Sequence, residues 1–205
     1  MQNMDFALLE KFGIPALPYA FAKNEKEAAM HAAKIGYPVA LKLSSEKALH
    51  KTEEGAVIVD VRNAQELADA CTKLLRIDSS SSARLLVQKM AKPRLELILG
   101  GRMDSQFGPV VLFGMGGIYT EIFRDRSLRV CPITIEDALE MIRELKAYPV
   151  LAGARGGKIA NENDLARIIV AASKLMMKEK PSELDINPLV WDGEHFVAAD
   201  VRVIR

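Results

Sequence analysis

The chain has 205 residues, of which 49% are hydrophobic, and this suffices for a buried core in one domain or two small lobes. Its 28 basic and 27 acidic side chains leave a formal net charge of +1, which excludes the strong positive field that gathers nucleic acid or anionic membranes. The first residues lack the continuous apolar segment of a signal peptide, and no apolar stretch reaches membrane-spanning length. We therefore expect a globular, cytoplasmic protein with no nucleic acid and no membrane as partner.

Capping patterns predict the helices at the start of the chain. An apolar face at helical spacing predicts a short entry helix over residues 5–12. Asn24, with Glu27 three residues later, predicts the start of a second helix, because an Asn side chain can accept from the free N–H groups of a first turn. The strand PVALKL is expected next.

A second strand, GAVIVDV, follows after a polar segment. Its alternation places Val57, Val59 and Val61 on one face of the predicted sheet. Asn63 then begins a third helix, which is expected to end near Arg76. The first half of the chain therefore predicts an αββαβ unit.

From Arg84 onward, strands follow one another too closely for crossover helices, which predicts antiparallel pairing. The expected strands are RLLVQKM, RLELILGGRM, PVVLFG, GIYTEIF and SLRVCPI. Thr134 caps one later helix, Asn161 or Asn163 begins another, and a hairpin with an Asp-Gly turn closes the chain. The fold class is α/β (α+β). The expected segments are an entry helix with its linker at 1–20 and two subdomains at 21–90 and 91–205.

Lys42 stands inside the otherwise apolar strand VALKL. Burying an ammonium group without a partner costs several kcal/mol, so an anionic group is expected to meet it. The alternative is a lysine that reaches solvent or pairs with a carboxylate.

The run FGMGG lies between two expected strands and contains Gly114, Gly116 and Gly117, with Glu121 shortly after it. Glycines let backbone N–H groups approach phosphate oxygens closely. The run lacks the lysine of a P-loop, and taken alone its pattern is more typical of a structural hairpin with glycine bulges.

ELDINPL and the later VAAD contain three residues whose side-chain oxygens could bind a metal ion. Period-two alternation puts Asp185 and Asn187 on one face, and Asp200 on the returning strand can stand across from them. Such oxygen ligands suit Mg²⁺ held together with nucleotide phosphates, whereas a plain polar ladder across the strands needs no metal. His50, in the polar segment between two strands, has the pattern of a solvated surface residue when taken alone.

These motifs together resemble the β subunits of ADP-forming acetate-CoA ligases, which belong to the NDP-forming acyl-CoA synthetase superfamily. The resemblance runs over nearly the whole chain. It is carried by LLEKFGIPALPYAFAKNEKEAAMHAAKIGYPVALKLSSEKALHKTEEGAV, LLVQKM, LELILGGRMDSQFGPVVLFGMGGIYTEIFRDRSLRVCPIT, GARG and ELDINPL. It implies an ATP-grasp fold, in which two lobes hold ATP or ADP between their sheets.

Site roles follow from the resemblance. Lys42 would contact a nucleotide phosphate, and Gln88, Lys89 and Met90 would form the hinge that meets the adenine through its backbone, with Glu96 near the ribose. The remaining candidates are phosphate-loop residues (Gly114, Gly116, Gly117, Glu121 and Arg155), Mg²⁺ ligands (Asn187 and Asp200, with Asp185 in the same cluster) and a histidine that is phosphorylated transiently, His50.

The resemblance also implies a partner. The reaction acyl-CoA + ADP + phosphate giving acid + CoA + ATP would need a CoA-binding α subunit or fused α-like domains. Three positions depart from the family pattern: Lys89 in the hinge, and Glu54 and Ala56 near the His50 loop. A noncatalytic regulatory module, or another ATP-grasp carboxylate ligase, is the alternative function.

Overall fold

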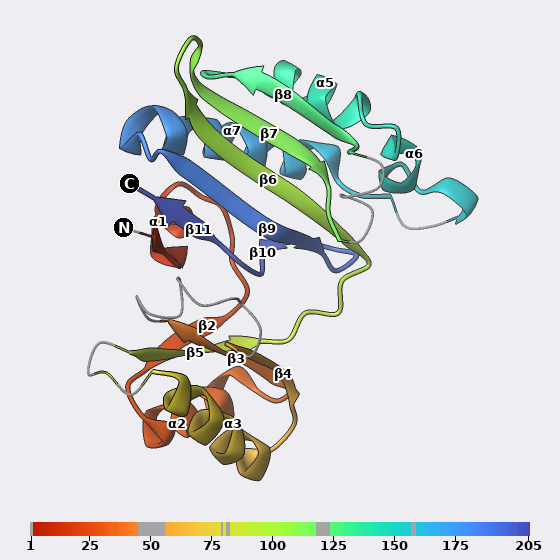
Figure 1. Cartoon of the computed structure of the whole chain (residues 1–205). Helices are drawn as coiled ribbons and strands as arrows, with labels where there is room; N and C mark the ends of the chain where they lie inside the picture. Colours follow the sequence, from red (N-terminus) through yellow and green to blue (C-terminus); the bar gives the residue numbers. More distant parts are fainter. Residues whose placement is uncertain (1, 45–55, 79, 81–82, 118–123, 157–158) are drawn as a thin grey trace. The chain divides into compact units, whose positions relative to one another are not determined.

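The computed structural model of the chain describes residues 2–44, 56–78, 80, 83–117, 124–156 and 159–205, and for Gln2, Asn3 and Arg155 it describes the backbone alone. The chain divides into two compact units, Leu17–Ala91 and the combination of Met1–Ala16 with Lys92–Arg205. Each unit has its own antiparallel sheet (Figure 1). Most of the expected strand GIYTEIF lies outside the described residues.

The unit Leu17–Ala91 has a four-stranded sheet, the small sheet, in the order β2-β5-β3-β4. Helices α2 and α3 cover one of its faces (Figure 1). Its elements are β2 (Tyr19–Ala22), α2 (Glu25–Ile35), β3 (Val39–Ser44), β4 (Val57–Val61), α3 (Ala64–Ile77) and β5 (Arg84–Lys89). Strand β2 was not expected from the sequence.

Both helices of this unit begin where the capping patterns predict. The Asn24 side chain accepts from the N–H of Glu27 at 2.9 Å, and the Asn63 side chain accepts from the N–H of Glu66 at 3.0 Å. The buried side of α3 includes Cys71, whose thiol pKa is raised to about 11 by desolvation. The local signals were therefore enough to place these helix starts.

The expected alternation of β4 is wrong at its end. Val57 and Val59 are exposed, but Val61 is buried in the core beneath the helices. The cause is an irregularity in the pairing of β3 with β4. Val39 pairs with Val61 and Leu41 pairs with Ile58, so β4 has one extra residue in this stretch, where Asp60 has φ of +59°. An extra residue in one strand reverses the face of every side chain after it.

The other unit has a seven-stranded sheet, the large sheet, in the order β1-β11-β9-β6-β7-β8, with β10 paired to β9. Its strands are β1 (Gln2–Asn3), β6 (Leu95–Asp104), β7 (Gly108–Met115), β8 (Arg126–Val130), β9 (Glu183–Trp191), β10 (Phe196–Ala198) and β11 (Arg202–Ile204). Its helical segments are α1 (Phe6–Lys11), α5 (Ile135–Arg143), α6 (Tyr148–Leu151), η1 (Ala154–Gly156) and α7 (Glu162–Glu179). No helix of the described residues is long and apolar enough to cross a membrane.

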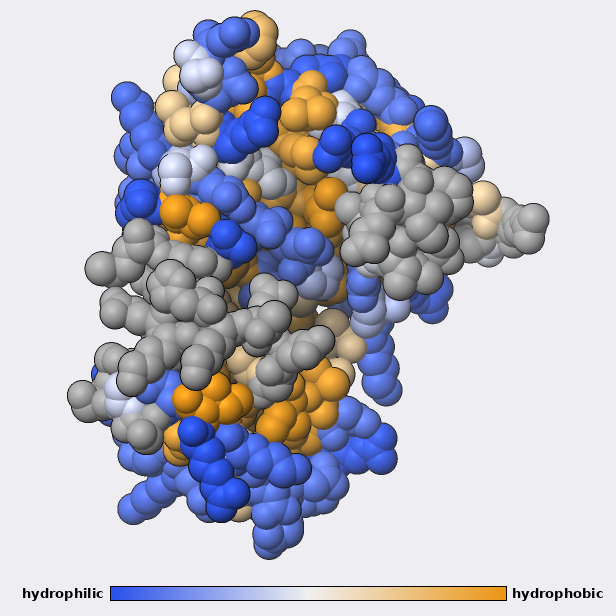
Figure 2. All heavy atoms as spheres, in the orientation of Figure 1, coloured by the Kyte–Doolittle hydropathy of each residue, from blue (hydrophilic) through white to orange (hydrophobic). Residues whose placement is uncertain are grey.

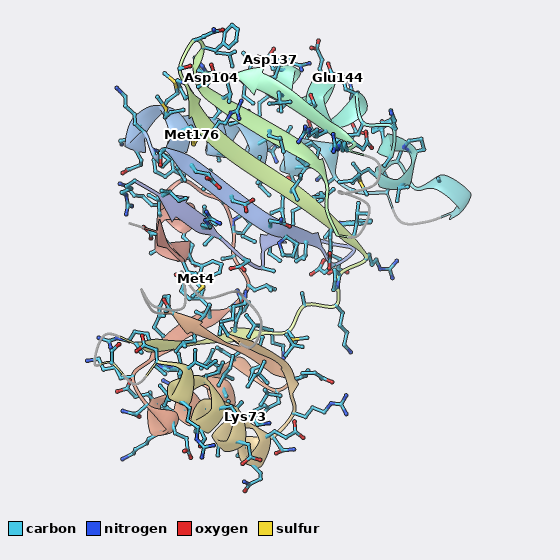
Figure 3. The ribbon with its side chains drawn as sticks, in the orientation of Figure 1. Met4, Lys73, Asp104, Asp137, Glu144 and Met176 are labelled. Carbon is cyan, nitrogen blue, oxygen red and sulfur yellow. The ribbon has the colours of Figure 1, made fainter. Side chains whose placement is uncertain are left out.

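Helices α5 and α7 cover one face of the large sheet (Figure 1). Thr134 caps α5 as predicted and forms a capping box with Asp137, and Asn161, rather than Asn163, caps α7. A Cβ placed on Gly101 of β6 would lie 2.7 Å from the Sδ of Met176 on α7 (Figure 3), so glycine is what lets this helix approach the sheet. The opposite face shows hydrophobic side chains over β7 and β8 (Figure 2), among them Leu128.

The N-terminal segment belongs to the large-sheet unit. Strand β1 pairs with β11, and the N–H of Ala198 donates to the carbonyl oxygen of Pro15. This placement follows from pairing between the two ends of the chain, which no local pattern shows. The functional division at 21–90 and 91–205 stays a prediction.

Candidate functional site

Lys42 lies on the face of the small sheet that α2 and α3 do not cover. Leu41 and Leu43 of β3 point into the helix-covered core, so alternation directs Lys42 to the opposite face. Its strand partners are Leu86 on β5 and Val57 on β4, and its side chain is half-buried. A lysine on this helix-free face can offer its ammonium group to an anionic ligand such as phosphate.

Lys89, in the expected hinge, directs its side chain away from that face. Its Nζ donates to the carbonyl oxygen of Gly36 at 2.6 Å and to that of Tyr37 at 3.4 Å, at the C-terminal end of α2. Carbonyl groups at a helix C-terminus carry partial negative charge, which the ammonium group offsets. The departure from the family pattern at Lys89 therefore has a structural role.

The backbone of the expected hinge also has partners within the small-sheet unit. The N–H of Lys89 donates to the carbonyl oxygen of Pro18 at 2.8 Å, and the N–H of Met90 donates to that of Pro38 at 3.3 Å. Gln88, by contrast, is buried with its side-chain Nε2 lacking a hydrogen-bond partner. A contact of this segment with a base stays a prediction.

The glycine run ends strand β7 and packs tightly against its neighbours. The N–H of Gly116 donates to the carbonyl oxygen of Glu96 at 2.8 Å, and a Cβ on Gly116 would lie 2.9 Å from the Glu96 carbonyl carbon. A Cβ on Gly114 would lie 2.6 Å from the carbonyl oxygen of Asp125, and Gly117 has φ of +65°. Strand packing therefore explains Gly114 and Gly116, and phosphate binding by the run stays a prediction.

Asp185 and Asn187 share one face of strand β9. Leu184 and Ile186 are buried towards the helices, whereas Asp185 is half-buried and Asn187 is exposed. The period-two alternation expected over this part of the strand is confirmed.

Asp200 lies in the link between β10 and β11 rather than inside a strand. The N–H of Ala199 donates to the carbonyl oxygen of Pro188 at 3.0 Å, which fixes this link beside the part of β9 that carries Asn187. One Asp200 carboxylate oxygen accepts from the N–H of Val201 at 2.9 Å. Two carboxylates and an amide oxygen are hard ligands, which fit Mg²⁺ when nucleotide phosphates complete its shell.

A metal site made of protein side chains alone is not found in the described part of the chain, where His, Cys, Asp and Glu form no group of three or more that could hold an ion. The Asp185, Asn187 and Asp200 set has only two such residues. It therefore needs further ligands, as Mg²⁺ sites that share a nucleotide do.

Arg202 is a candidate that the sequence reasoning missed. It pairs directly with Asp185 across β11 and β9, and its Nε is buried without a hydrogen-bond partner. A guanidinium group beside the predicted metal ligands has the geometry to bind phosphate oxygens. The available signal was its position two residues after Asp200.

Several predicted residues have no described side chain. His50, Glu54 and Glu121 lie outside the described residues, and Arg155 is placed by its backbone alone, in η1. Ala56 is described and packs half-buried against the small-sheet core. The functional roles of these residues stay predictions.

Comparison with known proteins identifies the family. The model of the ATP-grasp domain family matches residues 2–204. The chain belongs to the ATP-grasp family. The ATP-grasp fold expected from the resemblance is thereby confirmed, with an antiparallel sheet and covering helices in each unit.

The relatives of this ATP-grasp chain include acyl-CoA ligases. It is 41% identical over 203 residues to the acetate-CoA ligase [ADP-forming] I subunit beta of Pyrococcus furiosus, covering 96% of this chain and 88% of the relative. It is 39% identical to acetate-CoA ligase [ADP-forming] I of Archaeoglobus fulgidus, covering 96% of this chain but 30% of that protein.

A solved structure adds a bound nucleotide to the comparison. It is an acetyl-coenzyme A synthetase 1 of Ca. Korarchaeum cryptofilum in complex with coenzyme A and Mg-AMPPCP, whose phosphohistidine segment points towards the nucleotide binding site. The two chains superpose with a TM-score of 0.82 and 34% identity, over 96% of this chain and 87% of the other.

Proposed function

We propose that this ATP-grasp chain is the nucleotide-binding subunit or domain of an NDP-forming acyl-CoA synthetase, an acid-thiol ligase. The observation that carries the proposal is the match over nearly the whole chain to the Pyrococcus furiosus β subunit. The overall reaction would be acyl-CoA + ADP + phosphate giving acid + CoA + ATP.

The described residues have the chemistry for the nucleotide part of this reaction. Lys42 would bind a phosphate group, because its half-buried side chain lies on the helix-free face of the small sheet. The segment 88–90 would meet the base, and Glu96, half-buried on β6, would lie near the ribose. These roles account for side chains on the helix-free face of the small sheet and at the start of β6.

Asp185, Asn187 and Asp200 would hold Mg²⁺ through their oxygen atoms. Bound Mg²⁺ would neutralise charge on the nucleotide phosphates. Arg202 would add a positive group beside Asp185, because the two residues are paired across the strands. The donor set therefore matches a metal that is shared with the nucleotide.

His50 would carry the phosphoryl group. In the ATP-forming direction, the N–P bond of phosphohistidine breaks as a terminal oxygen of the ADP β-phosphate forms the new O–P bond. The departing ring nitrogen keeps the electron pair and the other ring nitrogen keeps its proton, so the histidine is left as a neutral imidazole. The support is the family resemblance of the segment LHKTEEG. The similar synthetase with its phosphohistidine segment directed at the nucleotide site gives further support.

A partner would complete the enzyme. The Pyrococcus furiosus relative is a β subunit, and this chain matches only 30% of the Archaeoglobus fulgidus protein. We therefore propose that a CoA-binding α subunit, or fused α-like domains, supplies acyl-phosphate chemistry in the cytoplasm.

Nucleotide binding tests the proposal directly. ADP and ATP are titrated calorimetrically into the purified chain, with and without Mg²⁺, and into the variants Lys42→Met and Lys73→Met. Lys73 is an exposed lysine on α3 (Figure 3), so its variant makes the same change away from the candidate site. We expect micromolar, Mg²⁺-dependent binding that Lys42→Met loses and Lys73→Met keeps.

The same titration separates the alternatives. A folded wild-type chain that binds no nucleotide at millimolar ligand would refute the proposal and favour a noncatalytic regulatory module. Acid-dependent release of ADP from ATP by this chain alone would instead indicate a carboxylate ligase that needs no phosphohistidine.

A further inference from the structure

Gln88 is a buried polar side chain with an unused donor. It is 2% exposed, and its Nε2 has no hydrogen-bond partner. Buried amide groups are nearly always hydrogen-bonded, because leaving a donor unpaired away from water costs free energy. A buried, unpaired donor in a predicted binding region therefore points to a ligand acceptor.

The strand register places this amide on the same face as Lys42. Leu85 and Val87 of β5 point into the helix-covered core, so Gln88 points to the opposite face, where Lys42 pairs with Leu86. Gln88 itself pairs with Ala40, so it is the diagonal neighbour of Lys42. Residues in such diagonal positions of an antiparallel pair are about 7–8 Å apart.

The surroundings of the amide suit a base better than a phosphate. Ala40 and Leu86 contribute apolar surface beside Gln88, which lies near the end of β5 and is the first residue of the segment 88–90. An amide has one donor side and one acceptor side, whereas a phosphate offers acceptors only. A base edge that carries one acceptor and one donor uses both sides of the amide.

Adenine has such an edge. Its N7 accepts and its exocyclic N6 donates, and a glutamine amide satisfies both together. Guanine presents N7 and O6, which are both acceptors, so the glutamine oxygen would face another oxygen. Building on the proposed function, we propose that the Gln88 side chain reads the N6/N7 edge of the base and makes this site selective for adenine over guanine nucleotides.

The test compares binding of ADP, GDP and 7-deaza-ADP, in which a CH group replaces the N7 acceptor, to wild type and Gln88→Met. Methionine keeps the approximate size of glutamine but removes both polar atoms. We expect Gln88→Met to weaken ADP binding about 5-fold to 150-fold and to lose most of the preference over GDP. Wild type should bind 7-deaza-ADP about 5-fold more weakly than ADP, and the variant should not distinguish them.

Thermal unfolding without nucleotide supplies a second readout. If the Gln88 amide donor is unpaired until a ligand binds, Gln88→Met removes a buried donor that has no partner. The unfolding midpoint of the variant should then equal or exceed that of wild type. A lower midpoint would assign Gln88 a structural role and overturn the inference.

The outcomes distinguish this inference from the proposed function. Tight ADP binding with the same ADP/GDP ratio and the same 7-deaza-ADP penalty in wild type and Gln88→Met would overturn the selectivity role alone. Absence of nucleotide binding by the folded wild-type chain would overturn the proposed function and this inference with it.

Discussion

Replacing Gly114 by alanine should destabilise the large sheet by about 1.5–3.5 kcal/mol. The new Cβ would lie 2.6 Å from the carbonyl oxygen of Asp125, where ordinary contact begins at 3.4 Å, so the start of β8 must move. That movement strains the hydrogen bond from the N–H of Met115 to the same oxygen, which is 3.0 Å long. Overpacking contributes about 1–3 kcal/mol and the weakened hydrogen bond about 1 kcal/mol, less about 0.5 kcal/mol for alanine in a strand.

Urea unfolding followed by tryptophan fluorescence measures this change. Trp191 is the single tryptophan and is buried on β9 of the same sheet. The midpoint should fall by about 1 M urea. Gly100→Ala is the matched control, since its Cβ would lie 3.4 Å from the nearest atom, the Leu184 carbonyl oxygen, and its stability should change by less than about 0.5 kcal/mol.

Equal stability of Gly114→Ala and Gly100→Ala would refute the packing explanation of the glycine run. If Gly114→Ala also lost ADP binding while remaining as stable as wild type, the run would act on phosphate and not on strand packing.

Three further predictions concern Lys89, Cys71 and the ion pair between Arg129 and Glu144. Lys89→Met should lower the stability of the small-sheet unit by about 1 kcal/mol, seen by circular dichroism, because α2 loses the ammonium at Gly36; no loss would contradict that capping role. Cys71, with a thiol pKa of about 11, should react with a thiol reagent at pH 8 at least about 100-fold more slowly than after unfolding, and equal rates would contradict its burial. The Arg129 guanidinium, then the Ser127 hydroxyl, lowers the pKa of Glu144, so the stability advantage of wild type over Arg129→Met should be present above about pH 5 and shrink as the pH falls towards 3; an advantage independent of pH would contradict it.

The helix starts could be predicted because capping is local. Asn24, Asn63 and Thr134 each accept a hydrogen bond from a backbone N–H three residues later, and the sequence contains both members of each pair. The strand β2 could not be predicted in the same way. Its four residues, Tyr19–Ala22, form a strand through pairing with β5, which lies far along the chain.

The same limit applies to the candidate site. Alternation was enough to place Asp185 and Asn187 on one face, but the irregularity at Asp60 reverses the face of Val61 and has no clear local signal. Whether the side-chain nitrogens of Gln88 and Arg202 have hydrogen-bond partners depends on which groups the fold brings near them, and the sequence does not show this. The roles of the site residues therefore came from the resemblance rather than from spacing.

Phosphoryl transfer to His50 tests the central claim most directly. The chain is incubated with ATP labelled at the γ-phosphate, Mg²⁺ and a CoA-binding α subunit, and acid-labile label on this chain is measured for wild type, His50→Asn and His195→Asn. His195 is an exposed histidine in the hairpin after β9 and serves as the matched control. We predict label on wild type and His195→Asn that is absent from His50→Asn. Equal labelling of His50→Asn, or no label on a wild-type chain that binds ATP, would contradict the account.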